Sequence, residues 1–198
     1  MVNDLEFTGE RYTPEISGNI FLEHMHRYVL AAGFVTGRDV LDIACGEGYG
    51  SNFLAATASS VVGVDIAAVA VLHARAKYKS DRLSFLVGSV TAIPLPDASV
   101  DVVVCFETIE HIDAQEAMML EVKRVLRPGG VMIVSMPDKA TYTDATGNTN
   151  PYHVKELYRD EFGALLAGHF KHQKMHGQKI VFGSAIFADG DTGHLAGR

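Results

Sequence analysis

A chain of 198 residues, 47% hydrophobic and 21% charged, is expected to fold as one globular domain with its own core, residues 1–198. Its 24 acidic residues outnumber its 17 basic ones, and the formal net charge of −7 argues against broad binding to nucleic acid or to an anionic membrane. The sequence shows no signal peptide and no run approaching the roughly 20 apolar residues of a membrane helix, so we expect a cytoplasmic protein without membrane insertion. Cys45 and Cys105 fall in predicted buried strands and are expected to be reduced thiols.

The N-terminal segment, residues 1–33, is predicted to be an irregular arm followed by a helix over residues 19–32. We interpret it as a lid over a site, the alternative being an arm that is simply packed down. Apolar side chains recur at helical spacing and predict the buried face of this helix: Phe21, Leu22, Met25, Val29 and Ala32.

Residues 38–137 alternate between predicted strands and predicted helices, and they should form the cofactor-binding core. Such alternation implies a parallel sheet covered by helices on both faces. Strands are expected in the first half of 39–50 and at 61–65, 83–87, 100–106 and 131–136, helices at 51–58, 67–79 and 113–126, and a tight turn at 128–130.

The C-terminal part begins with a polar loop, residues 138–158, which is long enough to suggest a substrate-binding role. A helix is expected at 159–168, then a hairpin-like pair of strands at 170–175 and 180–188, and a frayed tail at 189–198. Together the elements predict an α/β fold with a doubly wound, mostly parallel seven-stranded sheet and an antiparallel edge strand.

The stretch 39–50 predicts where a ligand binds. A buried strand is followed by glycines at alternate positions, and then by a helix, which is how a nucleotide-cofactor βαβ unit begins. The glycines let the backbone turn tightly and let a ligand lie against bare main chain, while the helix N-terminus offers unpaired N–H groups. NAD, FAD and S-adenosylmethionine sites all use such a turn.

Two acidic residues narrow the choice. Asp42 lies inside the first strand, four residues before Gly46, where a carboxylate would repel a pyrophosphate but hold an amino-acid ammonium, directly or through water. Asp65 closes the second strand and can accept both ribose hydroxyls, which would suit NAD equally well. The pattern therefore favours an amino-acid-bearing cofactor, and a nicotinamide-dependent oxidoreductase remains the less favoured alternative.

Several motifs carry a family resemblance. Residues 40–50, 61–65, 95–103 and 124–130 resemble class I S-adenosylmethionine-dependent methyltransferases of the type 11-like group, which have a Rossmann-like methyltransferase fold. Motifs at 9–12, 23–28, 106–111 and 150–157 are similar to bacterial methyltransferases found with polysaccharide and glycan assembly genes. The resemblance implies S-adenosyl-L-methionine as cofactor. It places Asp42, Ala44, Gly46 and Gly48 at the methionine part, Asp65 at the ribose, Ile66, Ser89 and Val90 at the adenine, and Phe106 and Tyr12 near the sulfonium.

Three residues are candidates for catalysis. Glu107 ends the fourth strand and would face the reaction centre, the alternative being a helix cap. His111 and His153 would lie on the acceptor rim, where a general base is possible; the alternatives are a hydrogen-bonded histidine at a helix start and a substrate contact. His169, His172 and His176 have no carboxylate at ligand spacing, so no metal site is predicted.

The acceptor is expected to be a small molecule or a sugar-containing glycan precursor, methylated at oxygen rather than nitrogen. Residues 105–108 carry neither the motif of nucleobase amino methylation nor a Pro-Cys nucleophile, so we expect no nucleic-acid substrate. The alternative from another class is a module that binds the cofactor but has lost turnover.

Overall fold

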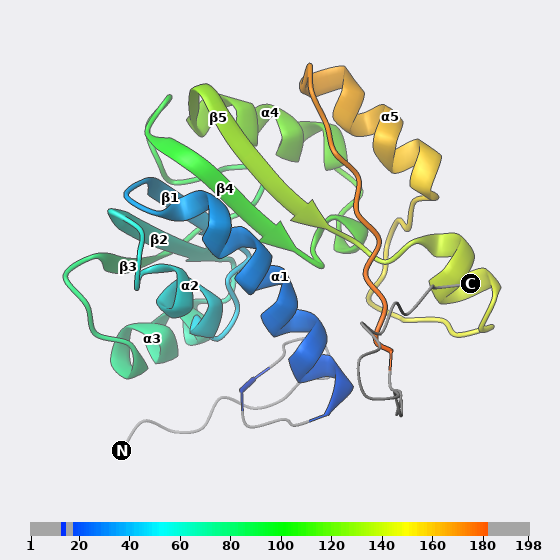
Figure 1. Ribbon diagram of the computed structural model, residues 1–198, viewed down its shortest axis with the longest axis horizontal. Helices are drawn as coiled ribbons and strands as arrows, with labels where there is room; N and C mark the ends of the chain where they lie inside the picture. The colour runs from blue at the N-terminus through cyan, green and yellow to red at the C-terminus, as the bar shows by residue number, and fades with distance from the viewer. Residues whose placement is uncertain (1–12, 15–17, 182–198) are drawn as a thin grey trace, which may run out of the picture.

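Figure 1 shows the chain as a computed structural model, which describes residues 13–14 and 18–181. The strands of the described part form one five-stranded parallel sheet in the order β3-β2-β1-β4-β5, so the direction of winding reverses between β1 and β4. The main elements are α1 (Asn19–Val35), β1 (Asp39–Ile43), α2 (Tyr49–Leu54), β2 (Ser60–Asp65), α3 (Ala68–Lys77), β3 (Leu83–Val87), β4 (Val100–Phe106), α4 (Gln115–Val125), β5 (Leu126–Ser135) and α5 (Arg159–His169). A short 3-10 helix, η1 (Ile109–His111), and a π-helical turn, η2 (Ala140–Asp144), complete the described set.

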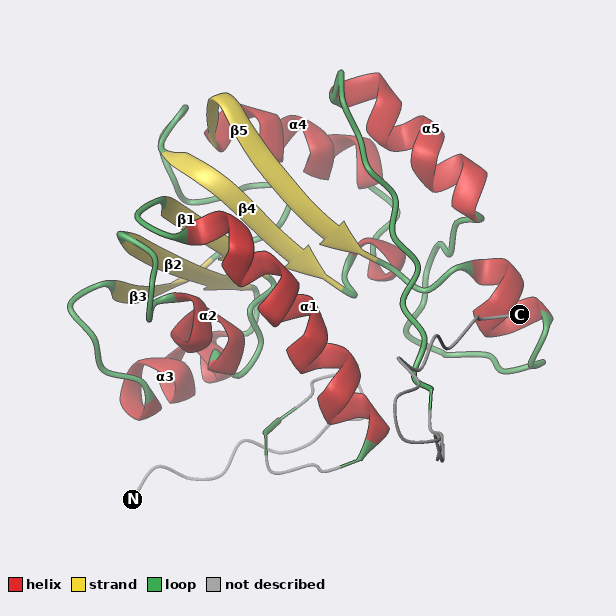
Figure 2. Cartoon of the chain, viewed as in Figure 1, coloured by secondary structure: helices red, strands yellow, loops and turns green. Residues whose placement is uncertain are grey.

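Helices cover both faces of the sheet, as the alternation of elements predicts (Figure 2). Successive strand residues point to opposite faces. Val40 of β1 therefore packs with α1 and α2, whereas Leu41 and Ile43 pack with α4 and α5. Helix α3 packs through Val71 and Ala74 against Cys45, which follows β1, and Phe85 of β3. None of the helices within residues 18–181 combines the length and the apolar character that crossing a membrane requires.

Strand β4, which lies between β1 and β5, shows why an uninterrupted apolar run belongs inside the sheet. It is buried along its length apart from Asp101 and Phe106, as expected for a parallel strand covered on both faces. The carboxylate of Asp101 is paired. It accepts a hydrogen bond from the Asp39 amide at 2.9 Å and forms an ion pair with Arg127 at 2.9 Å. Arg127 also pairs with Asp39, which fastens three strands together at their amino ends.

The predicted tight turn at 128–130 lies inside β5 as an irregularity. Val100 pairs with Leu126 and Val102 with Val131. Between these two pairs the chain advances by two residues on β4 but by five on β5, so β5 contains extra residues. Gly129 takes a left-handed conformation with φ 81 within this bulge. The turn and the strand predicted from 131 are thus one longer, interrupted strand.

One prediction about the periphery is wrong, and its companion is not tested. Residues 170–175 form no strand; the described chain from 171 to 179 is exposed and runs beside α1, where Gln178 donates to the Glu23 carbonyl at 2.9 Å. The predicted partner strand, 180–188, lies outside the described residues beyond 181, as does the tail. The described sheet therefore has five strands and no antiparallel edge strand.

The predicted buried face of the first helix is also wrong. Its buried residues are Tyr28, Ala31 and Val35, whereas Phe21 and Val29 are exposed. The apolar pattern alone did not predict that Tyr28 faces inward.

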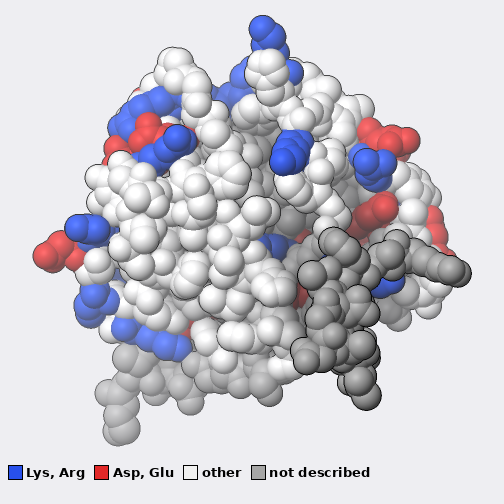
Figure 3. All heavy atoms as spheres, viewed as in Figure 1, with Lys and Arg blue, Asp and Glu red and all other residues white. Residues whose placement is uncertain are grey.

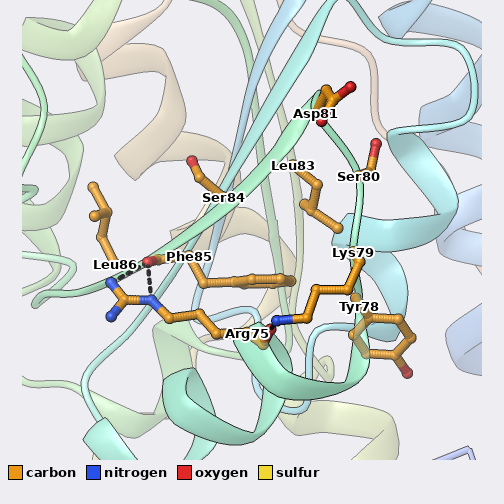
Figure 4. Close-up of a pocket in the computed structure, with 9 residues that line it drawn as sticks. All are labelled: Arg75, Tyr78, Lys79, Ser80, Asp81, Leu83, Ser84, Phe85 and Leu86. Atoms are coloured by element: carbon orange, nitrogen blue, oxygen red, sulfur yellow. Dashed lines mark hydrogen bonds between the residues drawn. The ribbon is translucent and has the colours of Figure 1, made fainter.

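The edge strand β3 is guarded by a side chain of α3. Arg75 donates from Nε and Nη2 to the Phe85 carbonyl, at 2.8 and 2.5 Å, and occupies an acceptor that a further strand would use (Figure 4). The hollow shown there lies between α3 and β3.

Candidate cofactor and acceptor site

The glycine turn follows β1 directly and bends the backbone sharply. Ala44, Gly46 and Gly48 all have left-handed conformations, with φ 58, 56 and 94. Gly48 caps α2, and a Cβ added to it would lie 2.9 Å from both the Cβ of Ala74 and the ring of Phe85. A side chain there would be strained and would clash with α3 and β3, so glycine lets the turn pack closely against both.

Asp42 lies beneath this turn and is almost completely buried. Its carboxylate accepts a hydrogen bond from Ser51 Oγ at 2.6 Å and from the Tyr28 hydroxyl at 3.2 Å. Burial raises the pKa of Asp42 to about 7, although the two hydrogen bonds act in the opposite direction. Gly50 makes this arrangement possible, because a Cβ on it would lie 1.9 Å from the Tyr28 ring.

Asp65 joins the end of β2 to the glycine turn. One carboxylate oxygen accepts the Gly46 amide at 2.8 Å, and the other accepts the Ala67 amide at 2.8 Å. Each oxygen keeps acceptor capacity for a ligand hydroxyl. Beside it, Ile66 is 75% exposed and offers an apolar surface at the rim.

Ser89 and Val90, the two residues expected at the adenine edge, make different contacts. The Ser89 hydroxyl lies 3.0 Å from the Thr91 hydroxyl and accepts the Thr91 amide at 3.2 Å, so it stabilises its own loop. Val90 packs against the core beneath the α4 face of the sheet. Tyr12, expected near the sulfonium, lies outside the described residues.

Glu47, within the turn, has a role that the sequence did not predict. Its side chain is 1% exposed and is bound by three residues of the α3 region: Lys77 at 2.8 Å, His73 at 3.0 Å and the Tyr78 hydroxyl at 2.7 Å. It points into α3 and anchors the turn. The basic pair His73 and Lys77, one helical turn apart on α3, was the available sequence signal.

Glu107 lies at the carboxyl end of β4 in a left-handed conformation, φ 49. Ser135, at the end of β5, donates to Glu107 Oε1 at 2.6 Å, and Arg27 Nη2 lies 3.4 Å from Oε2. Phe106 packs edge-on against Tyr28, with ring centroids 5.1 Å apart. Glu107 is thus held between strands and α1, and it does not cap η1, since the N-terminus of η1 has no side-chain cap.

Arg27 brings a cation to the same place. Its Nε donates to Gln178 at 2.8 Å, but its Nη1 is buried and has no hydrogen-bond partner among the described residues. A buried guanidinium N–H without a partner is costly, and it matches an anionic ligand group.

The two candidate histidines, remote in sequence, are in contact. The rings of His111 and His153 lie 4.9 Å apart at 81°. His111 Nδ1 lies 3.0 Å from the Tyr152 carbonyl, and His153 Nδ1 lies 2.5 Å from Glu156 Oε1. Burial opposes the ionisation of Glu156, but hydrogen bonds from Thr143 and His153 outweigh it and hold the pKa of Glu156 below its usual value.

The three histidines considered for a metal from the sequence do not come together as one set. His169 Nε2 lies 2.6 Å from Glu116, while His172 and His176 are exposed on the segment beyond α5. A different set, Glu110, His111 and His153, does come together within the described part of the chain.

Comparison with known proteins agrees with this architecture. Residues 41–134 match the methyltransferase domain family. A probable S-adenosylmethionine-dependent methyltransferase of Mycolicibacterium smegmatis is 42% identical over 165 residues, 82% of this chain and 63% of that relative, so this chain spans about three fifths of its length. The malonyl-(acyl-carrier protein) O-methyltransferase of Yersinia pestis is 35% identical over 121 residues, 60% of this chain and 44% of that protein.

A solved structure of a protein from Pyrococcus horikoshii shares the fold, with a TM-score of 0.68 and 23% identity, covering 79% of this chain and 84% of the other. Fold and sequence similarity therefore coincide on the region that contains the glycine turn. They show a methyltransferase domain over residues 41–134, similar in sequence to S-adenosylmethionine-dependent methyltransferases, whose cofactor is S-adenosylmethionine.

Proposed function

We propose that this protein transfers a methyl group from S-adenosylmethionine to an oxygen of a small molecule or of a sugar-containing glycan precursor. The observation that carries the proposal is the pair of acids at the glycine turn, Asp42 beneath it and Asp65 beside it. A carboxylate beneath the turn is unfavourable for a pyrophosphate, and it is complementary to the ammonium of the methionine part.

The residues present fit this cofactor. Gly46 and Gly48 bend the turn in left-handed conformations and carry no side chain, Asp65 retains acceptor capacity for ribose hydroxyls, and Ile66 offers an exposed apolar side chain for the adenine. We assign Arg27 to the carboxylate of the methionine part, because its buried Nη1 lacks a partner within the described residues.

When bound, the cofactor supplies an activated methyl group on a sulfonium, so the protein mainly has to position the acceptor in line with it. Phe106 and Glu107, at the carboxyl end of β4, are placed to border the reacting atoms. An alcohol must also lose a proton, and the pair His111 and His153 is proposed to promote that loss. Side-chain exposure of 28% for His111 and 7% for His153 puts His111 on the side that an acceptor can reach.

Oxygen rather than nitrogen is supported by this histidine pair, since an amine needs only to arrive neutral. The Yersinia pestis relative is named an O-methyltransferase. A nucleic-acid acceptor is disfavoured by the acidic net charge of −7. On the face drawn in Figure 3, Lys and Arg side chains are dispersed rather than gathered into one continuous surface. Cytoplasmic action is supported by Cys45 and Cys105, which are buried and unpaired thiols.

The test begins with calorimetry of S-adenosylmethionine, S-adenosylhomocysteine and NAD binding. Binding of the first two, followed by formation of S-adenosylhomocysteine when small-molecule and glycan-precursor fractions are added, would support the proposal. Binding of the cofactor without turnover on any fraction would favour the catalytically silent module. Tight NAD binding without S-adenosylhomocysteine binding would overturn the proposal in favour of an oxidoreductase.

A further inference from the structure

We propose that Glu110, His111 and His153 form a binding site for a divalent transition-metal cation. Each side chain offers one ligand atom, and these atoms lie within 4.8 Å of one another. Two imidazoles and one carboxylate are the ligands that Zn²⁺ and Fe²⁺ use where coordination positions stay open. Ligand atoms around a cation at about 2.1 Å lie roughly 3–3.5 Å apart, so the most distant atoms of the set have to approach one another by roughly 1.5 Å.

The hydrogen bonds of the two imidazoles orient them for such a role. The Tyr152 carbonyl can only accept, so His111 Nδ1 carries the hydrogen of that 3.0 Å contact and the lone pair is on Nε2. His153 Nδ1 is likewise paired with the Glu156 carboxylate, which leaves its Nε2 as the ligand atom. His111 Nε2 already lies 3.8 Å from Glu110 Oε1. Imidazole with its second nitrogen on a carbonyl or carboxylate is the usual outer arrangement of a metal-bound histidine.

The backbone holds the three residues in place from two remote segments. The Glu110 carbonyl accepts the amides of Val154 and Lys155, at 2.9 and 3.0 Å, which fastens the loop carrying His153 to η1. Gln115 Nε2 donates to the carbonyls of Ile109 and Lys155, both at 3.0 Å. The ligand set is therefore assembled without a further rearrangement of the chain.

Burial differs across the set in a way that suits an open coordination position. The side chains of Glu110 and His153 are 1% and 7% exposed, whereas that of His111 is 28% exposed. The cation would be enclosed on one side and would face solvent beside His111. This is the side on which the acceptor is proposed to bind.

The chemical role of the cation rests on the proposed function, whereas the binding site itself does not. Coordination of an acceptor hydroxyl would lower its pKa, as it does for bound water. The hydroxyl proton passes to solvent, and the oxygen lone pair forms the bond to the methyl carbon. The carbon–sulfur bond breaks with its electrons remaining on sulfur, which gives a methyl ether and S-adenosylhomocysteine. The histidines then act as ligands and not as the base.

Metal binding can be measured without any acceptor. Tag-free protein treated with a chelator and then dialysed against Zn²⁺ or Co²⁺ should retain one equivalent, and Co²⁺ should give a visible absorption band. Glu156→Gln, which alters the partner of His153 and of Thr143 but none of the three proposed ligands, should weaken binding 10–100-fold. Glu110→Gln and His153→Ala should weaken it more, while His172→Ala, which removes an exposed histidine, should leave it unchanged.

Lack of stoichiometric binding by the wild type would overturn the inference, and so would equal binding by the wild type and the Glu110→Gln and His153→Ala variants. Circular dichroism of each variant checks that it is folded. If His153→Ala does not fold, the isosteric variants Glu110→Gln and Glu156→Gln still test the site. Calorimetry with S-adenosylmethionine separates the two proposals. Cofactor binding without metal binding refutes the metal site alone, and metal binding without cofactor binding refutes the proposed function alone.

Discussion

Replacing Asp42 by asparagine should make folding stability less sensitive to pH and should weaken cofactor binding. The buried carboxyl accepts hydrogen bonds from Ser51 and Tyr28, and an asparagine carbonyl oxygen can still accept them. What the substitution removes is the ionisation of a group whose pKa is raised by burial from 3.8 to about 7.

The sign follows from proton linkage. A carboxyl that binds its proton more tightly in the folded state stabilises the protein fully below its unfolded pKa, and this stabilisation is lost as the pH rises through the folded pKa. For Asp42 the window runs from 3.8 to about 7. The whole shift corresponds to about 4 kcal/mol, of which about 2.5 kcal/mol falls between about pH 5 and about pH 8.

Urea unfolding followed by circular dichroism, at several pH values across this window, measures the effect. The free energy of unfolding of Asp42→Asn, minus that of the wild type, should rise by about 2.5 kcal/mol from about pH 5 to about pH 8. Asp81→Asn makes the same chemical change at an exposed position and should give a constant difference. A constant difference for Asp42→Asn as well would refute the reasoning. Calorimetry at about pH 8 should show cofactor binding weakened by about 1.5–3 kcal/mol, through loss of a charge-assisted contact.

Three further substitutions test the site. Asp65→Ala should weaken cofactor binding by about 1–3 kcal/mol by calorimetry, and unchanged affinity would remove the ribose assignment. Gly50→Ala should destabilise the fold by about 1–3 kcal/mol in urea unfolding, because its Cβ would displace the Tyr28 ring; an unaffected midpoint would show that the ring moves freely. Arg27→Met should weaken S-adenosylmethionine binding by about 1–3 kcal/mol while leaving adenosine binding unchanged, and equal losses for both ligands would exclude a role at the methionine carboxylate.

Local chemistry in the sequence predicted the strand, the glycine turn and the helix on which the candidate site is built. A strand, a glycine turn and a helix are adjacent in the chain, so their relation does not depend on remote packing. The acid inside β1 is informative for the same reason, because a buried strand position is expensive for a carboxylate unless something uses it. The parallel sheet with helices on both faces followed from the order of the elements and is confirmed.

Contacts between segments that are remote in the chain could not be predicted from the sequence. The pairing of His111 with His153 depends on how the loop before α5 lies on η1, and the place of Arg27 depends on the rotation of α1 about its axis. That rotation was mispredicted because apolar side chains on α1 occur on more than one face. The strand predicted at 170–175 is not formed. That segment contacts α5, where Gln173 donates to the Gly163 carbonyl, and the chain reaches α1 at Gln178 without pairing with either edge of the described sheet.

The fastening of the His153 loop to η1 has a consequence for how such proteins diverge. The loop lies after residues 41–134, the part that matches the family, and it is attached through backbone groups of Glu110, Val154 and Lys155. Backbone attachment places little constraint on side-chain identity. If the loop borders the acceptor, as proposed, it can exchange side chains and change which acceptor it favours while the glycine turn is left untouched.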